Sequence, residues 1–196
     1  MKSGAWGTWA PLWMCGPTLA NSTVGIVGLG RIGMAVAKRL QPFGVKSFLY
    51  SGRSPKSHAA EISAKFVPMD ALLAQSDFVI ATCALSDETR ELFNWTVFKK
   101  MKNTAIFVNT SRGGIVKQDD LYEALANGDI RGAGLDVTVP EPLPTDSPLL
   151  KLPNCVVLPH IGSATNETRS EMSALCARNI LAALKGERMP AQVEIK

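Results

Sequence analysis

The stretch TVGIVGLGRIGMAVAKRLQ, residues 23–41, combines two hydrophobic patterns that are separated by a glycine-rich turn. Residues 23–28 form a short apolar run, which predicts a buried strand. Residues 31–41 carry a helical pattern, and Pro42 directly after them is expected to end the helix. The stretch therefore predicts a strand, a tight turn and a helix in close succession.

The turn contains three glycines, Gly28, Gly30 and Gly33, in the pattern GxGxxG. In a dinucleotide-binding loop, the first glycine permits the tight turn and the second lets the backbone approach a pyrophosphate. The third allows close packing of helix and strand. The N-terminus of the helix then offers N–H groups to the anion. We therefore expect a dinucleotide-binding loop, and the alternative is a glycine-rich turn that binds no ligand.

The end of the second predicted strand distinguishes between the two nicotinamide dinucleotides. An NAD site usually has an acidic residue about 20 residues after the loop, where it holds the ribose 2′-hydroxyl. No acidic residue lies between Val45 and Ser57, and the segment YSGRSPK supplies Arg53 and Lys56 instead. A guanidinium can bind a 2′-phosphate through two charge-assisted hydrogen bonds. We therefore expect NADP(H) rather than NAD(H), unless these cations are only solvated loop charges.

The remainder of the chain alternates short apolar runs with helical patterns. Further strands are expected at 45–50, 64–67, 77–84, 104–110, 132–137 and 154–160. Further helices are expected at 69–76, 95–101, 118–128 and 167–185. Strands that lack strict alternation and are separated by helices predict a parallel sheet covered on both faces. The expected fold class is α/β, with a Rossmann-type doubly wound parallel sheet.

The composition is that of a globular protein with a substantial apolar core. Of the 196 residues, 46% are hydrophobic and 19% are charged. The net charge of +4 comes from scattered basic residues, so we expect no nucleic-acid partner. No apolar run is long enough to span a membrane and the N-terminus lacks a secretory signal, so we expect no membrane partner. Four cysteines without a CxxC spacing predict free thiols, no metal site and a cytoplasmic location.

Arg112, Glu141 and His160 each come at or just after the end of a predicted strand, where α/β folds place their chemistry. Taken singly, each has a purely structural explanation: Arg112 as a surface charge, Glu141 as part of a rigid PEP turn and His160 as a loop histidine. Together, and downstream of a dinucleotide loop, they indicate an active site. The other histidine, His58, is expected to be exposed in a polar loop.

These three residues suit the reduction of a 2-oxo acid by a nicotinamide cofactor. The planar guanidinium of Arg112 can hold the substrate carboxylate and polarise the ketone. His160 can donate the proton, because the pKa of an imidazole lies near neutral pH. A carboxylate at Glu141 would favour the imidazolium form and so raise the pKa of that histidine. Asp136 is a candidate for orienting the nicotinamide carboxamide.

The segments GLGRIG, NTSRGG, GLDVTVPEPLP and LPHIGSAT, in this order, resemble the D-isomer-specific 2-hydroxyacid dehydrogenases. The resemblance covers nearly the whole chain. Within that family, YSGRSP, PEPLPTDSPLL and PHIGSATNETR are most similar to the members that reduce glyoxylate and hydroxypyruvate. The resemblance implies Arg112 as the substrate anchor, Glu141 as the partner of the histidine and His160 as the proton donor.

The same resemblance implies two sets of binding residues. The substrate-binding residues are Arg112, His160 and Gly162. The cofactor-binding residues are Gly28, Gly30, Arg31, Ile32 and Gly33 at the pyrophosphate, Arg53, Ser54, Pro55 and Lys56 at the 2′-phosphate, and Ala84, Thr110 and Asp136 toward the nicotinamide.

The family's chains begin with a further segment that builds most of a second, substrate-binding domain. By this resemblance we expect a dimer arm at 1–20, an NADP-binding domain at 21–162 and the rest of the substrate domain at 163–196. In the last part we expect an uncovered apolar stripe of Met172, Leu175, Ile180 and Leu184. In the arm, we expect either a dimer contact or a small cluster on the core from Trp6, Trp9 and Trp13.

Three functions remain open. The first is an NADPH-dependent reductase that converts a 2-oxo acid to the D-2-hydroxy acid, or the cofactor half of one, in which hydride transfer could be slow or lost because closure of two domains normally completes the site. The second is a catalytically inactive dinucleotide-binding module. The third is a scaffold like the corepressors that resemble this family. The joint presence of Arg112, Glu141 and His160 favours the first.

Overall fold

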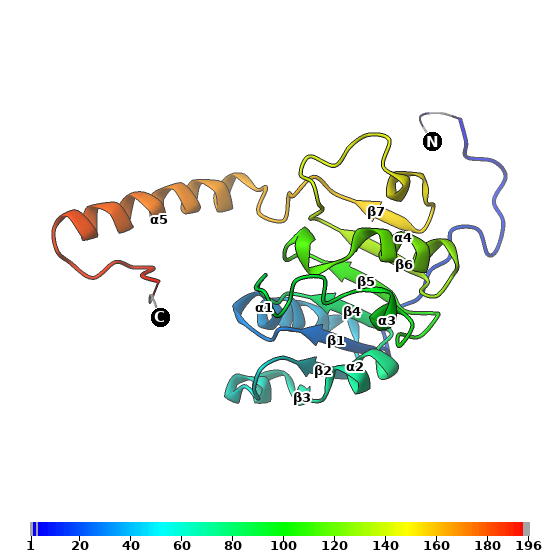
Figure 1. The fold of residues 1–196 in the computed structure, drawn as a ribbon, viewed down its shortest axis with the longest axis horizontal. Coiled ribbons are helices and arrows are strands. Elements are labelled where there is room, and N and C mark those ends of the chain that lie inside the picture. The colour runs from blue at the N-terminus through cyan, green and yellow to red at the C-terminus, as the bar shows by residue number, and fades with distance from the viewer. Residues whose placement is uncertain (1, 3, 194–196) are drawn as a thin grey trace. The chain divides into compact units, whose positions relative to one another are not determined.

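The computed structural model describes residues 2 and 4–193, and a parallel sheet forms its centre (Figure 1). Within this described part, seven strands follow the order β3-β2-β1-β4-β5-β6-β7, and every neighbouring pair is parallel. The strands are β1 (Thr23–Val27), β2 (Ser47–Ser51), β3 (Lys65–Phe66), β4 (Phe78–Ala81), β5 (Ile106–Asn109), β6 (Gly132–Leu135) and β7 (Cys155–Val157). The expected α/β class and parallel sheet are confirmed.

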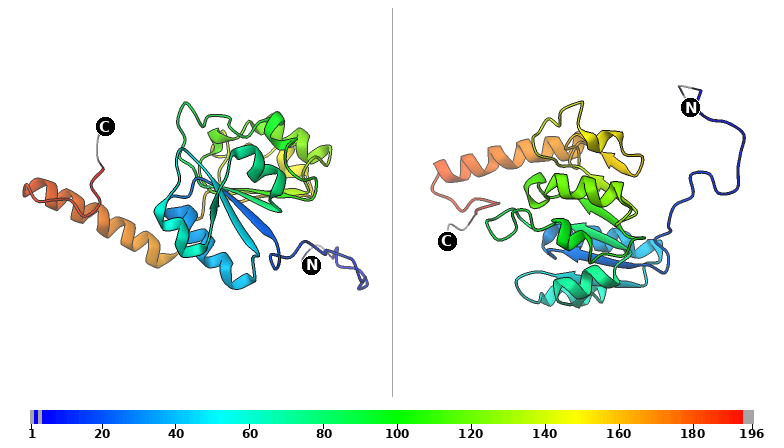
Figure 2. Two further views of the ribbon diagram at one scale, coloured as in Figure 1. Left: turned by 90° about the horizontal axis from the view of Figure 1, so that it is seen from below. Right: turned by 45° about the vertical axis from the view of Figure 1, so that its right-hand side comes forward.

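Helices connect successive strands and lie on both sides of the sheet (Figure 2). The α-helices are α1 (Arg31–Leu40), α2 (Met69–Gln75), α3 (Trp95–Phe98), α4 (Gln118–Ala126) and α5 (Asn166–Leu184). Residues 2 and 4–193 also contain four short 3-10 helices, which the sequence patterns did not predict: η1 (Gln41–Phe43), η2 (Ser57–Ile62), η3 (Gly113–Ile115) and η4 (Pro148–Lys151). The first helix ends at Leu40, one residue earlier than expected, and Pro42 lies inside the 3-10 turn that follows it.

The apolar core has two parts, one on each face of the sheet. In β4, the side chains of Val79 and Ala81 belong to the cluster that includes α2, α3 and α4. The intervening Ile80 belongs to the cluster that includes α1 and η2. Because both faces are covered, these strands are apolar at consecutive positions, as a parallel sheet requires. Because the faces are covered, the exposed polar side chains of the sheet lie at the ends of its strands.

The chain reverses its direction of travel across the sheet between β1 and β4. Both β2 and β4 lie beside β1, one on each side. In doubly wound folds, ligands bind outside the carboxyl ends of the strands at this switch point. The loops after β1, β2, β4, β5 and β6 therefore begin at one common edge, and this edge carries the predicted cofactor residues, Arg112 and Glu141.

Residues Leu158–Lys196 form a second compact unit, separate from Met1–Val157. Its helix α5 begins at a Thr165 cap, where the Thr168 N–H donates to Thr165 Oγ1 at 3.1 Å, and Gly186 follows its end with a φ of +69°. The expected apolar stripe is largely uncovered, since Met172, Ile180 and Leu184 are 51%, 56% and 80% exposed. The domain boundaries expected from the sequence stay predictions.

The segment before β1 contains no helix or strand in its described residues. Its tryptophans, Trp6, Trp9 and Trp13, are 57%, 76% and 50% exposed. They therefore do not form the packed cluster over the core that was one of the two expectations for them. Across the described chain, no helix is both long and apolar enough to cross a membrane.

Candidate functional site

The phosphate loop joins β1 to α1 and is held by the neighbouring strands. Gly28 has a φ of +96°, and a Cβ there would lie 2.7 Å from the backbone of Cys83. The Gly28 N–H donates to the Ser51 carbonyl at 2.9 Å, and Thr82 Oγ1 donates to the Gly28 carbonyl at 2.7 Å. A Cβ at Gly33 would lie 2.6 Å from the same carbonyl oxygen. Side chains at these two glycines would thus push the helix and the strands apart.

Gly30 faces open space, in contrast to the other two glycines. No atom lies within 4 Å of a Cβ built at Gly30, and the residue caps α1 by accepting a hydrogen bond from the Met34 N–H at 2.9 Å. The first N–H groups of a helix have no acceptor within the helix and are available to an anion. The open space beside them, with Arg31 and Ile32 exposed, fits a dinucleotide pyrophosphate.

A basic loop, defined here as residues 52–56, follows β2 at the same edge. All five residues are exposed, including Arg53, Ser54, Pro55 and Lys56. Because Ser51 pairs with Val27 at the end of β1, the basic loop leaves the sheet beside the phosphate loop. This position suits a group attached to the adenosine ribose of a dinucleotide whose pyrophosphate lies on α1.

His58 is not the exposed loop histidine that the sequence suggested. It is half-buried in η2, and its Nε2 lies 3.0 Å from the Leu29 carbonyl oxygen of the phosphate loop. The sequence pattern could not show this contact, because η2 is a short 3-10 helix without an apolar period. In the sequence, η2 is indicated by two apolar residues three positions apart, Ala59 and Ile62, which are both buried.

The predicted nicotinamide-side residues follow three neighbouring strands. Ala84 comes after β4, Thr110 after β5 and Asp136 after β6, and these strands pair in that order. Strand β4 is shorter than expected and stops at Ala81, because the chain then turns to pass Gly28. Burial raises the pKa of the Cys83 thiol in this turn, which keeps the thiol protonated beside the phosphate loop.

Arg112 lies on an exposed turn that a buried amide organises. Asn109, which is fully buried at the end of β5, donates from Nδ2 to the Arg112 carbonyl at 3.0 Å. Its Oδ1 accepts a hydrogen bond from the Ser111 N–H at 3.0 Å, and the Ser111 hydroxyl donates to the Cys83 carbonyl. The turn is thus tied to its own strand and to the loop after β4. Sequence reasoning overlooked Asn109, although a buried polar residue at a strand end is a recognisable signal.

The glycine after Arg112 brings the ends of β5 and β6 together. A Cβ at Gly113 would lie 2.0 Å from the Thr138 carbonyl oxygen, which leaves no room for a side chain. Thr138 in turn donates its N–H to Glu141 Oε1 at 3.1 Å and its hydroxyl to the Pro140 carbonyl at 2.9 Å. The Arg112 turn and the Glu141 carboxylate are therefore anchored to the same short segment.

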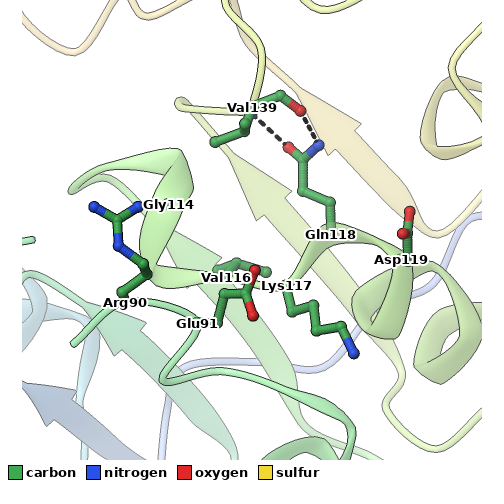
Figure 3. A pocket seen from close by; sticks show the side chains of 8 residues that line it. All are labelled: Arg90, Glu91, Gly114, Val116, Lys117, Gln118, Asp119 and Val139. Carbon is green, nitrogen blue, oxygen red and sulfur yellow. Dashed lines mark hydrogen bonds between the residues drawn. The ribbon is translucent and has the colours of Figure 1, made fainter. Parts of the chain in front are cut away.

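A hollow of about 300 Å³ opens beside the Arg112 turn (Figure 3). Gln118, at the start of α4, holds its upper wall, because its Oε1 accepts from the Val139 N–H at 2.8 Å and its Nε2 donates to the Val139 carbonyl. The wall includes cations and anions, with Arg90, Glu91, Lys117 and Asp119. This pair of hydrogen bonds fixes Val139, two residues before Glu141. It was not predicted from the sequence.

The third predicted catalytic residue belongs to the second unit. His160 follows β7 with a φ of +53° and an exposed side chain, and Gly162 is exposed two residues later. The cofactor residues, Arg112 and Glu141 all lie in the first unit. Among residues 2 and 4–193, no group of three His, Cys, Asp or Glu side chains is arranged to hold a metal ion.

Comparison with known proteins relates this edge of the sheet to a family of oxidoreductases. Residues 1–162 match the model of the D-isomer specific 2-hydroxyacid dehydrogenase NAD-binding domain. The glyoxylate reductase/hydroxypyruvate reductases of Mus musculus and Homo sapiens are each 59% identical over 196 residues. Those alignments cover 100% of this chain and 60% of each relative, so the chain spans three fifths of their length.

A solved structure gives the same relation in three dimensions. A crystal structure of a Thermus thermophilus protein superposes with a TM-score of 0.91 at 43% identity. The superposition covers 98% of this chain and 60% of that one. The two chains therefore share their fold across the matched region.

Proposed function

The chain belongs to the D-isomer-specific 2-hydroxyacid dehydrogenase family, and we propose that it takes part in the reduction of a small 2-oxo acid. The observation that carries the proposal is the Arg112 turn, which Asn109 and Gly113 hold at the same edge as a glycine-rich dinucleotide loop. The names of the mouse and human relatives favour glyoxylate and hydroxypyruvate as substrates. The product would be the D-2-hydroxy acid.

In the proposed reaction, the nicotinamide cofactor, when bound in its reduced form, supplies the hydride. Arg112 holds the substrate carboxylate with its planar guanidinium and polarises the keto oxygen. His160 donates its proton to that oxygen as the alkoxide forms, so that the ketone gains one hydride and one proton and becomes an alcohol. Gly162 lies beside His160 in the chain and belongs to the proposed substrate-binding set.

Glu141 acts on the histidine in this proposal. Its carboxylate, anchored by the Thr138 N–H, would accept a hydrogen bond from the His160 imidazole. A negative charge there favours imidazolium and raises the pKa of the histidine, so the proton is still present when the alkoxide develops. The carboxylate would also fix which ring nitrogen points toward the substrate.

The proposed cofactor is NADP(H) rather than NAD(H). Four exposed residues of the basic loop, Arg53, Ser54, Pro55 and Lys56, lie next to the phosphate loop, and no acidic residue occupies the loop. Arg53 and Lys56 provide the positive charge that a 2′-phosphate requires. Ala84, Thr110 and Asp136 are proposed to face the nicotinamide end of the same dinucleotide.

A second candidate function is dinucleotide binding without turnover. It is favoured by the division of the proposed residues, since every cofactor residue lies in the first unit while His160 lies in the second. Binding therefore depends on one compact unit, whereas catalysis depends on two. No feature of the described chain favours the scaffold hypothesis over these two.

We also propose that the protein is a cytoplasmic homodimer. The three exposed tryptophans before β1 support a contact with a second copy, because large aromatic side chains are enriched at protein interfaces. Sedimentation of the purified chain should then give a dimer, and of a Trp9→Ser variant a larger monomer fraction. A monodisperse monomer for the unmodified chain would remove this part of the proposal.

Turnover tests the proposed function directly. The purified chain is mixed with NADPH and hydroxypyruvate, and the loss of nicotinamide absorbance is followed for the unmodified protein and for His160→Ala. The reductase proposal expects oxidation of NADPH that the substitution reduces by about a hundredfold or more. A chain that binds NADPH but oxidises none would leave the second candidate function in place of the first.

A further inference from the structure

Two side chains outside the binding loops, Tyr50 and His58, hold the basic loop in position. The loop itself, residues 52–56, is exposed throughout and makes few contacts of its own. Exposed charged loops normally lose conformational freedom when they bind a ligand, and this loss weakens affinity. Side chains that already fix the loop would therefore strengthen recognition of whatever the loop binds.

Tyr50 is buried in the core and forms a hydrogen bond with the last residue of the basic loop. Its ring is 3% exposed and contacts Phe66 with a distance of 5.3 Å between ring centroids. Its hydroxyl oxygen accepts a hydrogen bond from the Lys56 N–H at 2.8 Å. The bond joins Tyr50, near the end of β2, to Lys56, the last residue of the loop, so both ends of the loop are tied to β2.

His58 ties the same segment to the phosphate loop. A carbonyl oxygen can only accept, so the 3.0 Å contact between His58 Nε2 and the Leu29 carbonyl requires the hydrogen to be on Nε2. Leu29 lies between the first two glycines of the GxGxxG pattern and is 2% exposed. The contact therefore sets the separation between the basic loop and the backbone that would hold a pyrophosphate.

The 3-10 helix that carries His58 is itself anchored, so the contact rests on a fixed support. Ala59 and Ile62 are 4% and 2% exposed and belong to the core cluster around α1. Glu61 accepts a hydrogen bond from Lys38 Nζ of α1 at 2.6 Å. Lys38 lowers the pKa of Glu61 through this bond and through its charge, which keeps the carboxylate ionised.

From these contacts we infer that Tyr50 and His58 are positioning residues that select a ribose 2′-phosphate monoester, by fixing the basic loop at a set distance from the phosphate loop. The inference rests on the proposed function, since the 2′-phosphate belongs to the proposed NADP(H). Neither side chain touches the phosphate in this account. Tyr50 fixes the end of the loop that carries Lys56, and His58 fixes its spacing from Leu29.

The experiment compares NADPH and NADH affinities, measured by nicotinamide fluorescence, for the unmodified chain and for Tyr50→Phe, His58→Ala and His58→Gln. Tyr50→Phe retains the ring and removes only the acceptor, so we expect NADPH to bind about fivefold more weakly while NADH changes less than about twofold. His58→Ala should also reduce the ratio of NADPH affinity to NADH affinity. His58→Gln should restore it, because an amide N–H can donate to the Leu29 carbonyl.

Tyr122→Phe on α4 is the matched control, since it removes a hydroxyl far along the chain from the basic loop and should change neither affinity. Circular dichroism of each variant verifies that it is folded. Variants that weaken both nucleotides equally, or keep the full preference, would overturn the positioning roles while the NADPH assignment survives. An unmodified chain that binds both nucleotides equally would overturn the NADPH assignment and the inference with it.

Discussion

Two exposed arginines lie at the same edge of the sheet, and they are supported in different ways. Arg112 sits on a turn bonded from below by the fully buried Asn109 and packed through Gly113 against the backbone of Thr138. Arg53 sits on an exposed loop that is joined to β2 at both ends, by the chain itself and by the hydrogen bond from Lys56 to Tyr50, and that is linked to the phosphate loop through His58. The turn that carries the proposed substrate clamp is therefore anchored in the core, whereas the loop that carries the proposed cofactor selector is attached to the surface. Changes near Arg112 should therefore affect folding as well as function, and changes near Arg53 only the choice of nucleotide.

The largest effect is expected from Arg112→Ala, which removes the clamp and leaves its support in place. Loss of a group that stabilises developing charge on a carbonyl oxygen costs about a hundredfold to a thousandfold in rate. We expect kcat/KM for hydroxypyruvate to fall by that factor, with NADPH affinity unchanged. Arg131→Ala, an exposed arginine just before β6, is the control. An equal loss in both variants would show that Arg112 is an ordinary surface charge.

The second largest effect is expected from Gly113→Ala, which disturbs the packing of the Arg112 turn against Thr138 and leaves the Arg112 side chain unchanged. The new Cβ would lie 2.0 Å from the Thr138 carbonyl oxygen, and backbone atoms cannot move aside as a flexible side chain can. We expect the free energy of unfolding, measured in urea, to fall by about 3 kcal/mol. Gly114→Ala is the neighbouring control, because its Cβ would meet flexible side chains and no backbone, with Leu85 at 3.2 Å and Arg90 at 3.9 Å. Similar stability of the two variants would contradict the close packing of this turn.

A smaller loss is expected from Asn109→Ala, which leaves the turn without its buried hydrogen bonds. The N–H of Ser111 and the carbonyl of Arg112 would both lose a partner, and we expect the free energy of unfolding to fall by about 2 kcal/mol. The exposed Asn103→Ala should change it by less than about 0.5 kcal/mol. If Asn109→Ala matched that control, the buried amide would not be what organises the Arg112 turn.

The smallest effect in free energy is expected from Arg53→Ala. Removing one charge-assisted contact should weaken NADPH about tenfold and leave NADH within about twofold, with no change in the urea midpoint. Arg39→Ala, an exposed arginine of α1, serves as the control for a general loss of positive charge. Equal losses for both nucleotides would contradict the role of Arg53 at a 2′-phosphate.

The sequence predicted the frame of the molecule well because the frame depends on local patterns. The apolar runs at 23–28 and 104–110 and the spacing of Gly28 and Gly33 each have one physical explanation, and the structure contains the corresponding strands and the tight turn. What the sequence did not predict were contacts between distant segments. Asn109 looked like a polar strand end, and its buried bonds to the turn appear only in three dimensions.

The 3-10 helices were overlooked for a related reason. Such helices are too short to show a hydrophobic period, so η2 resembled a polar loop and His58 an exposed residue. Its contact with Leu29 spans 29 positions in the chain. The proposed site residues were found from motifs, whereas the residues that hold them in place were found only from the structure.

A dinucleotide site at the carboxyl edge of this sheet can be verified by titrating the purified 196-residue chain with NADPH and following nicotinamide fluorescence. We expect saturable binding of NADPH, because every proposed cofactor residue lies in the first unit, and weaker binding of NADH, because only NADPH has a phosphate for Arg53 and Lys56. A folded chain that binds neither nucleotide would contradict this expectation.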